Sequence, residues 1–407
     1  MTDSSLTSDE RYALGCMSGT SLDGLDVATV RLSGRGRGLS AEVIDHLGIP
    51  FDEALREQLQ RLASDKPARP SEIAMLARRL GNLHADLCEE AVGRIEASMR
   101  GELAFVAVHG QTIAHHPGSV AGPDWGTTWQ LIDPFPTAER LRVRVCTDLR
   151  GADVAAGGEG APITPAADPI LFPLDQAVVV NLGGIVNATR WSARDAEPPG
   201  LPWPAVEGGD VGPCNLLLDP LAEALLGGVR YDVDGAVAAS GQIDDRLVDW
   251  IVVMIDTAMR GGNTSASRRP RSLGREQFGQ AFIESTLEEA GRLELAPADV
   301  LASAVDAVAR RIAEWVGGTC TTDVVLAGGG VRNLALVARL VARLSEARVR
   351  VSSELGLLPE AREAAAMAVL GAMALDGLPI TIPSITGAAR LTPAGRWTLP
   401  ALRGDLR

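Results

Sequence analysis

The chain has 407 residues, of which 46% are hydrophobic and 22% are charged, and its net charge is −14. This composition is typical of a globular protein, and the length suits two domains. The negative charge argues against a nucleic-acid-binding protein, because phosphate backbones recruit basic surfaces. It leaves room for a small anionic substrate, which needs only a local cluster of donors.

The first ten residues, 1–10, are polar and acidic, without the basic start and apolar stretch of a signal peptide. No apolar run reaches the roughly 18 residues of a membrane span. We therefore expect a short disordered leader on a cytoplasmic protein. The five cysteines are scattered and form no C-x-x-C pair, so we expect buried free thiols in a reducing compartment.

The chain contains a single lysine, Lys66, in a loop-like stretch over residues 63–70. A P-loop requires a lysine after its glycines, and a protein kinase requires one on its third strand. Neither context exists in this sequence. Any phosphoryl transfer must therefore hold the triphosphate with backbone N–H groups, hydroxyls, a metal ion and arginine.

The first half predicts a β-hairpin followed by a third strand, a helix and a fourth strand. The predicted strands cover residues 12–16, 25–32 and 42–48, and a turn rich in Gly, Ser, Thr and Asp (17–24) joins the first two. A helix with apolar periodicity is predicted over residues 70–99, with Ser71 as its N-cap. The fourth strand, 103–108, is expected to end in the polar tip His109-Gly110-Gln111-Thr112.

The second half repeats this order. A second hairpin is predicted from strands at residues 176–181 and 188–191 around a glycine-rich turn. Four helices follow, at 215–226, 244–260, 276–292 and 297–316. The last predicted elements are a strand at 323–327, a helix from Asn333, a strand at 347–351 and a helix at 360–375. Residues 192–208 and 260–274 are predicted to be surface loops. The two hairpins are separated by about 165 residues, a typical domain length. We predict two α/β lobes, each offering a phosphate hairpin to a shared cleft.

The first turn reads GCMSGTSLDGLD over residues 15–26. Further blocks follow in order: VHGQTI at 108–113, WQLID at 129–133, TDLRGADVAAGGEGAP at 147–162, NLGGIVN at 181–187, DVGPCN at 210–215, DGAVAASG at 234–241, GGGVRN at 328–333 and PSITGA at 383–388. This series closely resembles the anhydro-N-acetylmuramic acid kinases over nearly the whole chain.

The resemblance implies a two-lobed actin-like/hexokinase-like (ribonuclease-H-like) ATPase fold, with ATP and sugar in the cleft between the lobes. We place the N-terminal lobe at residues 11–153 and the C-terminal lobe at 154–359. Residues 360–407 are expected to form a helix and tail that pack back at the cleft. Homodimers are a further implication of the resemblance.

The resemblance also implies a reaction that belongs to peptidoglycan recycling. Water opens 1,6-anhydro-N-acetylmuramic acid at its anomeric carbon, and the released 6-oxygen takes the γ-phosphoryl group of ATP. Such an opening needs a carboxylate as general base, with room for water, as in inverting glycosidases. Asp153 matches the family's catalytic aspartate, and the glycines after it would let backbone approach a sugar. Without the surrounding block, Asp153 would be interpreted as an exposed turn carboxylate.

Three glycine-rich segments are expected to bind Mg·ATP through backbone N–H groups and hydroxyls. The first contributes Gly19, Thr20, Ser21, Leu22, Asp23, Gly24, Leu25 and Asp26; the second contributes Gly183, Gly184 and Asn187; the third, for adenosine, contributes Gly328, Gly329, Gly330 and Asn333. Carboxylates are the expected Mg²⁺ ligands, directly or through water. The candidates are Asp23, Asp26 and, by resemblance, Glu363.

The expected sugar-binding residues are His109, Gln111, Gln130 and Glu363. By itself, His109 could equally be a satisfied polar residue at a sheet edge. The neighbouring pair of histidines at 115–116 is interpreted as part of a loop and not as a metal site, because no third ligand accompanies it.

The sequence departs from the family pattern at several positions that we place in the second lobe. Val211 and Cys214 replace a hydroxyl residue and a glycine, Glu159 replaces a glutamine, and Val233 replaces a lysine. These changes keep alternatives open: a kinase of another anhydro sugar such as levoglucosan, an ordinary sugar kinase in which Asp153 deprotonates a hydroxyl, or a silent nucleotide-binding sensor. The partners expected are a small sugar and ATP, with no nucleic acid and no membrane.

Overall fold

A computed structural model describes residues 10–19, 22, 24–64, 66–95, 103–122, 124–192, 205–260, 278–317 and 323–401. The chain divides into two compact units, one of residues 1–173, 196–206 and 361–407, and the other of residues 174–195 and 207–360. Among the described helices, none has the length and apolar character needed to cross a membrane.

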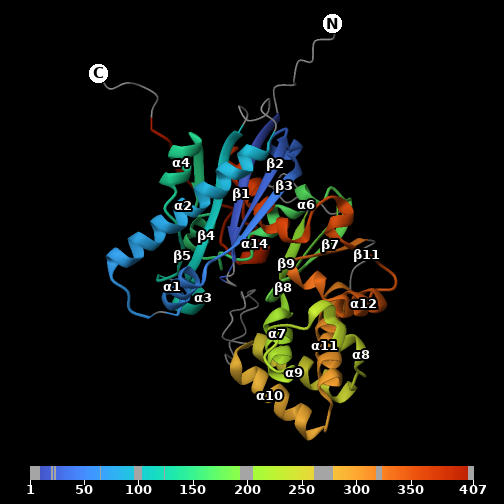
Figure 1. The fold of residues 1–407 in the computed structure, drawn as a ribbon. Helices are drawn as coiled ribbons and strands as arrows, with labels where there is room; N and C mark the ends of the chain where they lie inside the picture. Colours follow the sequence, from blue (N-terminus) through green and yellow to red (C-terminus); the bar gives the residue numbers. More distant parts are fainter. Residues whose placement is uncertain are drawn as a thin grey trace, which may run out of the picture. The chain divides into compact units, whose positions relative to one another are not determined.

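The first unit contains a seven-stranded sheet with helices on both faces (Figure 1). Its strands are β1 (Glu10–Ser18), β2 (Gly24–Ser33), β3 (Ser40–Pro50), β4 (Leu103–His116), β5 (Thr127–Leu131), β6 (Arg144–Thr147) and β12 (Arg396–Thr398). Its helices are α1 (Glu53–Ala63), α2 (Pro70–Arg94), α3 (Gly118–Ala121), α4 (Phe135–Leu141), α5 (Gly151–Ala155), α6 (Asp168–Leu171), α13 (Arg362–Leu375) and α14 (Pro383–Thr386). The strand order is β12-β6-β4-β1-β2-β3, with β5 paired to β4.

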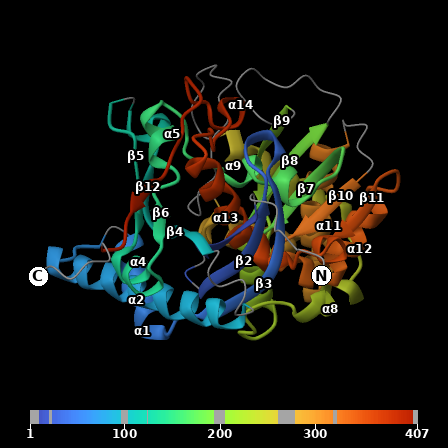
Figure 2. The same ribbon diagram turned by 90° about the horizontal axis from the view of Figure 1, so that it is seen from above.

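Alternation along β1 explains how this sheet is covered, because successive side chains point to opposite faces. Gly15 lies against α13, where an added Cβ would overlap the backbone carbonyl of Ala364. The next residue, Cys16, faces α2, and its Sγ lies 3.5 Å from that of Cys88. The long helix α2 and the apolar helix α13 therefore cover opposite faces (Figure 2).

The described cysteines confirm the expectation of buried free thiols. Cys16, Cys88, Cys146 and Cys214 are buried and unpaired, whereas Cys320 lies outside the described residues. The hydrogen bond with Cys88, together with burial, holds the pKa of the Cys16 thiol well above its usual range. Thiols in this state are inert nucleophiles.

The second unit contains a five-stranded sheet and a cluster of helices. The strands are β7 (Gln176–Leu182), β8 (Ile185–Ser192), β9 (Val206–Pro213), β10 (Asp323–Ala327) and β11 (Arg348–Val351). The helices are α7 (Asn215–Leu225), α8 (Ala236–Ser240), α9 (Asp245–Arg260), α10 (Gln280–Arg292), α11 (Pro297–Val316) and α12 (Leu334–Arg343). The apolar α11 is buried along most of its length, in contact with α7, α8, α9 and α12.

The five strands of the second sheet repeat the topology of five strands of the first. The order β9-β8-β7-β10-β11 repeats the order β3-β2-β1-β4-β6, with an antiparallel hairpin (β7–β8, β1–β2) followed by two parallel neighbours. This duplication confirms the predicted fold class, in which each lobe carries one hairpin.

Several sequence-based boundaries were wrong in detail. The first unit continues to residue 173, so the predicted division at 153–154 falls inside α5, and residues 361–407 belong to this unit. Strand β4 does not end before the polar tip but runs on to His116, so that the two histidines predicted to be in a loop are strand residues. The N-cap of α2 is Arg69 and not Ser71, because Pro70 occupies the first helical position. Most of both predicted loops lies outside the described residues, and β9 begins within the first of them.

Candidate active site

Asp153 is fully buried, which corrects the alternative interpretation as an exposed turn carboxylate. It lies in the short helix α5, and both of its carboxylate oxygens accept hydrogen bonds. The backbone N–H of Gly160 donates to Oδ2 at 2.8 Å, and the hydroxyl of Thr386 donates to Oδ1 at 2.7 Å. Two fixed donors hold the charged carboxylate in one orientation, as a general base requires.

Two of the glycines after Asp153, Gly158 and Gly160, contact its carboxylate. A Cβ on Gly158 would overlap Asp153 Oδ2, so only glycine lets the loop fold over this side chain. The C-terminal segment closes the same loop through two backbone hydrogen bonds, from Glu159 N to Thr386 O at 2.7 Å and from Ala389 N to Ala156 O at 2.8 Å. Residues far apart in the sequence thus enclose one carboxylate.

A cationic side chain, Arg150, organises the polar residues beside this loop. Its Nε donates to His109 Nε2 at 2.7 Å, and its Nη1 donates to the carbonyl of Gly160 at 2.8 Å. Because Nε2 accepts, His109 carries its proton on Nδ1, which lies 2.8 Å from the carbonyl of Gly110. Burial and the nearby guanidinium lower the pKa of His109 to about 3, so the ring is neutral. Both ring nitrogens of this predicted sugar-binding residue are engaged within the protein.

Two further polar residues lie near this loop. Burial and Arg150 lower the pKa of His115 to about 4, and its Nδ1 lies 2.9 Å from the hydroxyl of Thr128. Glu159, which replaces the family's glutamine, is buried and accepts a hydrogen bond from Ser119 at 2.9 Å. Glu159 belongs to the first unit, so placing this departure in the second lobe was wrong.

The side-chain amide of Gln111 is hydrogen-bonded to the turn after β1. The carbonyl of Gly19 accepts from Gln111 Nε2 at 3.0 Å and from the backbone N–H of Leu22 at 3.3 Å. Leu22 adopts a left-handed φ of +58° and buries its side chain in the core. A buried amide and a buried leucine therefore anchor the turn. Three predicted phosphate-binding residues lie outside the described residues: Thr20, Ser21 and Asp23.

From this geometry we predict that Gln111 affects ATP binding through the turn, an effect that can be separated from the sugar contact predicted for it. We expect Gln111→Met to raise the KM for ATP about 10-fold, because the turn loses the amide that fixes Gly19. Gln130→Met is the matched variant: the Gln130 amide donates to Thr128 at 2.8 Å and makes no hydrogen bond to the residues of the turn that the structure describes. Initial rates across ATP and sugar concentrations would check this, and a change confined to the sugar KM of Gln111→Met would contradict it.

The remaining described residues of the first turn differ in exposure. Leu25 is fully buried, and Gly24 packs where a Cβ would lie 2.5 Å from the carbonyl of Ile49. The Asp26 side chain is 41% exposed, and its Oδ1 lies 2.9 Å from His46 Nε2. Of these residues, Asp26 offers a carboxylate that a hydrated metal could reach.

In the second unit, the amides that begin α7 hold the turn between β7 and β8. The N–H groups of Asn215 and Leu216 donate to the carbonyls of Gly183 and Gly184, both at 3.1 Å. Asn187, on β8, donates from its side chain to Asp210 on β9. This hairpin is therefore fixed to the adjacent helix and strand.

The third glycine-rich segment follows β10. Gly328 has a φ of +82°, and Gly330 leaves no room for a side chain beside Leu182. Asn333 caps α12 by accepting from Leu336 N at 3.0 Å. The third segment thus lies against the end of the strand that leads into the second glycine-rich turn, because Gly328 also lies beside Asn181 of β7.

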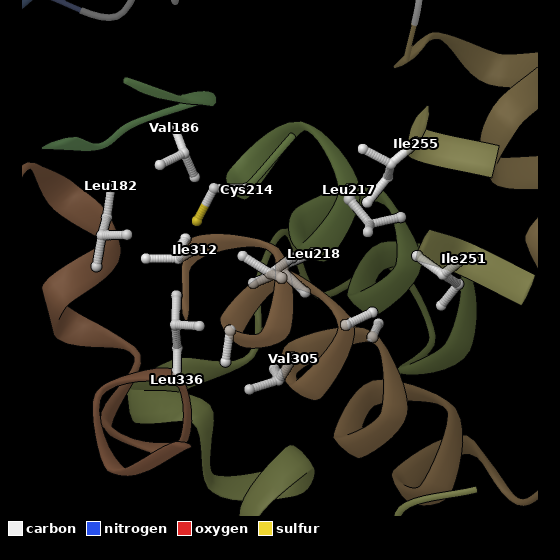
Figure 3. Close-up of a cluster of buried hydrophobic side chains, with 14 of the residues drawn as sticks. Leu182, Val186, Cys214, Leu217, Leu218, Ile251, Ile255, Val305, Ile312 and Leu336 are labelled. Carbon is white, nitrogen blue, oxygen red and sulfur yellow. The ribbon is translucent and has the colours of Figure 1, made fainter. Parts of the chain in front are cut away.

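Two departures from the family pattern lie in the core of this unit. Cys214 and Val211 are almost fully buried, and Cys214 packs among apolar side chains that include Leu182 and Val186 (Figure 3). Burial raises the pKa of the Cys214 thiol to about 12. Val233, in contrast, is 57% exposed. The apolar core of this unit therefore accommodates both Val211 and Cys214.

Glu363 lies in the first turn of α13 and is half-buried. The preceding residue, Arg362, is fully buried and forms a bidentate ion pair with Asp168, with Nη2–Oδ1 and Nη2–Oδ2 distances of 2.7 and 2.6 Å. This pair fixes the start of α13 and therefore the backbone of Glu363.

The sequence does not reveal the partners that hold Asp153 and His109. Thr386 and Arg150 stand inside blocks that resemble the family, but nothing in those blocks shows that they bond to Asp153 and His109. No motif or spacing in the sequence around Asp168 indicates that it pairs with Arg362.

Residues 11–399 match the family described as anhydro-N-acetylmuramic acid kinase. The chain belongs to this family. An anhydro-N-acetylmuramic acid kinase of Salinibacter ruber is 34% identical over 400 residues, covering 96% of each chain. Those of Gloeobacter violaceus and Xanthomonas campestris are 35% and 36% identical, covering 95% and 92% of this chain and 98% and 94% of their own.

Proposed function

We propose that this chain is an ATP-dependent hydrolytic kinase that converts 1,6-anhydro-N-acetylmuramic acid into N-acetylmuramic acid 6-phosphate. The observation that supports this most directly is the buried Asp153, held by two donors in a block that matches the family. A carboxylate held in this way could act on water or on a sugar hydroxyl, and the family match favours water. The proposal includes a cytoplasmic setting, where ATP is available, and a place in cell-wall recycling.

In the proposed reaction, Asp153 accepts a proton from water as the water oxygen bonds to the anomeric carbon. The bond between that carbon and O6 breaks, and O6 takes the γ-phosphoryl group while ADP leaves. The electron pair on O6 is used in bonding to phosphorus, so no separate acid is needed for this leaving group. The neutral His109 and the cation Arg150 would keep the polar surroundings of the base fixed while the proton moves.

Phosphate binding is proposed for the backbone N–H groups of the two hairpin turns and of the third glycine-rich segment. The anchored Gly19 carbonyl and the α7 amides on Gly183 and Gly184 preorganise these turns. Preorganised donors suit phosphoryl transfer, which depends on positioning and charge neutralisation.

Mg²⁺ is part of the proposal. The described residues contain no group of three or more side chains that could hold a metal by themselves. This fits Mg²⁺, which keeps several waters and binds through one or two carboxylates and the substrate phosphates. Asp26 and Glu363 would supply those carboxylates. The ion would neutralise charge on the transferred group.

The test is to incubate the protein with Mg·ATP and a panel of sugars: 1,6-anhydro-N-acetylmuramic acid, levoglucosan, N-acetylmuramic acid and glucose. We expect ADP release with the first sugar, and a product that has gained both a phosphoryl group and water, detected by mass spectrometry. Turnover of levoglucosan alone would reassign the sugar. Phosphorylation of reducing sugars only, or of none, would overturn the proposal.

A further inference from the structure

The hydroxyl of Thr386 is the closest side-chain partner recorded for Asp153. It lies 2.7 Å from Oδ1, and both residues are almost completely buried. A hydroxyl that donates to a carboxylate forms a short, charge-assisted hydrogen bond. The other acceptor near this hydroxyl, the carbonyl of Ile382, is 3.4 Å away, so its proton is directed to Asp153.

The backbone around Thr386 fixes this hydroxyl in place. Thr386 ends α14, and Gly387 follows with a left-handed φ of +75°, so the chain turns sharply after the helix. After that turn, Ala388 N approaches Thr386 Oγ1 at 3.4 Å and Ala389 N bonds to the carbonyl of Ala156 at 2.8 Å. The C-terminal segment is thereby joined to the loop that follows the base.

We infer that Thr386 is a positioning residue that orients Asp153 as a general base through a hydrogen bond to Oδ1. The inference rests on the proposed function, which gives Asp153 the role of base. Since Gly160 N already holds Oδ2, the Thr386 bond fixes the remaining rotation of the carboxylate. Without it, Oδ1 would be buried without its closest donor and the carboxylate could turn away from water.

A double-mutant cycle tests this inference. We expect Thr386→Val to lower kcat about 10- to 100-fold with the KM for ATP unchanged, because a misplaced base slows chemistry without weakening nucleotide binding. Thr386→Ser, which restores the hydroxyl, should regain most of the wild-type rate. In an Asp153→Asn background, Thr386→Val should cause little further loss, because residues that act as a unit are not additive.

The control variant is Thr381→Val in the same segment. Thr381 is also buried, but its hydroxyl has no hydrogen-bond partner among the described residues, so its removal should leave kcat unchanged. Equal rate losses for Thr386→Val in both backgrounds, or a Thr386→Ser variant as slow as Thr386→Val, would overturn the inference.

The cycle remains informative if the proposed function fails. If the wild type turns over another sugar, the four variants are measured on that sugar. If it turns over none, the cycle is measured as melting temperature with Asp153→Ala in place of Asp153→Asn, because asparagine can keep a hydrogen bond to Thr386. Thr386→Val should then destabilise the wild type more than the Asp153→Ala protein. Equal shifts would show that the two side chains are not coupled and would overturn the inference.

Discussion

Replacing Asp153 by asparagine should lower kcat about 10²- to 10⁴-fold and leave ATP binding nearly unchanged. The amide cannot take a proton from water, but it can keep the local structure. Asn Oδ1 can accept from Gly160 N–H, and Asn Nδ2 can donate to Thr386, because a hydroxyl also accepts. The loss should therefore appear in catalysis and not in folding, as measured by steady-state kinetics and nucleotide titration.

The control for this variant is Asp52→Asn. Asp52 is exposed and caps α1 by accepting from Leu55 N at 2.8 Å, a role that asparagine fills equally well. The Asp52→Asn substitution also removes one negative charge from the first unit and should leave kcat unchanged. Turnover of Asp153→Asn equal to that of Asp52→Asn would remove Asp153 from the mechanism.

Local patterns were sufficient to predict several elements around the two hairpins, but not α1 or β9, the strand beside β8. The helix α11 and the strand β10 begin and end where the sequence predicted, because apolar periodicity and flanking glycine or proline define them. The short strands β5, β6 and β12 were not predicted, since their three to five residues lack the continuous apolar run of β10. Their place depends on pairing with neighbours elsewhere in the sheet.

The candidate site was predicted through resemblance more than through chemistry. Asp153 stood out because of its block, but its partner Thr386 is 233 positions away and no spacing rule connects them. The glycine at 158 was interpreted as room for a sugar, whereas its nearest neighbour in the structure is the Asp153 carboxylate. A glycine pattern reports that something approaches the backbone closely, but tertiary structure decides what it is.

The buried ion pair of Arg362 and Asp168 is the second feature with a large expected effect. Asp168→Ala should destabilise the first unit by about 3–5 kcal/mol, because it leaves a guanidinium buried without its counter-charge. Calorimetry should then show a melting temperature lower by roughly 6–20 °C. The exposed pair of Asp249 and Arg310 provides the comparison, and Asp249→Ala should cost no more than about 1 kcal/mol.

The double variant Asp168→Ala/Arg362→Met separates the stability lost through the unpaired charge from the stability lost through the cavity. Removing the stranded guanidinium should recover most of the lost stability, since buried pairs can be replaced by apolar side chains at little cost. A double variant no more stable than Asp168→Ala would show that the cost arises from the cavity and not from the charge. If the double variant regains stability but has a lower kcat than the wild type, the pair is needed to place Glu363. Glu363 follows Arg362 on α13, the helix that also packs against Gly15. The ion pair would then connect the stability of α13 to both the carboxylate proposed for Mg²⁺ and the strand that leads into the first phosphate turn.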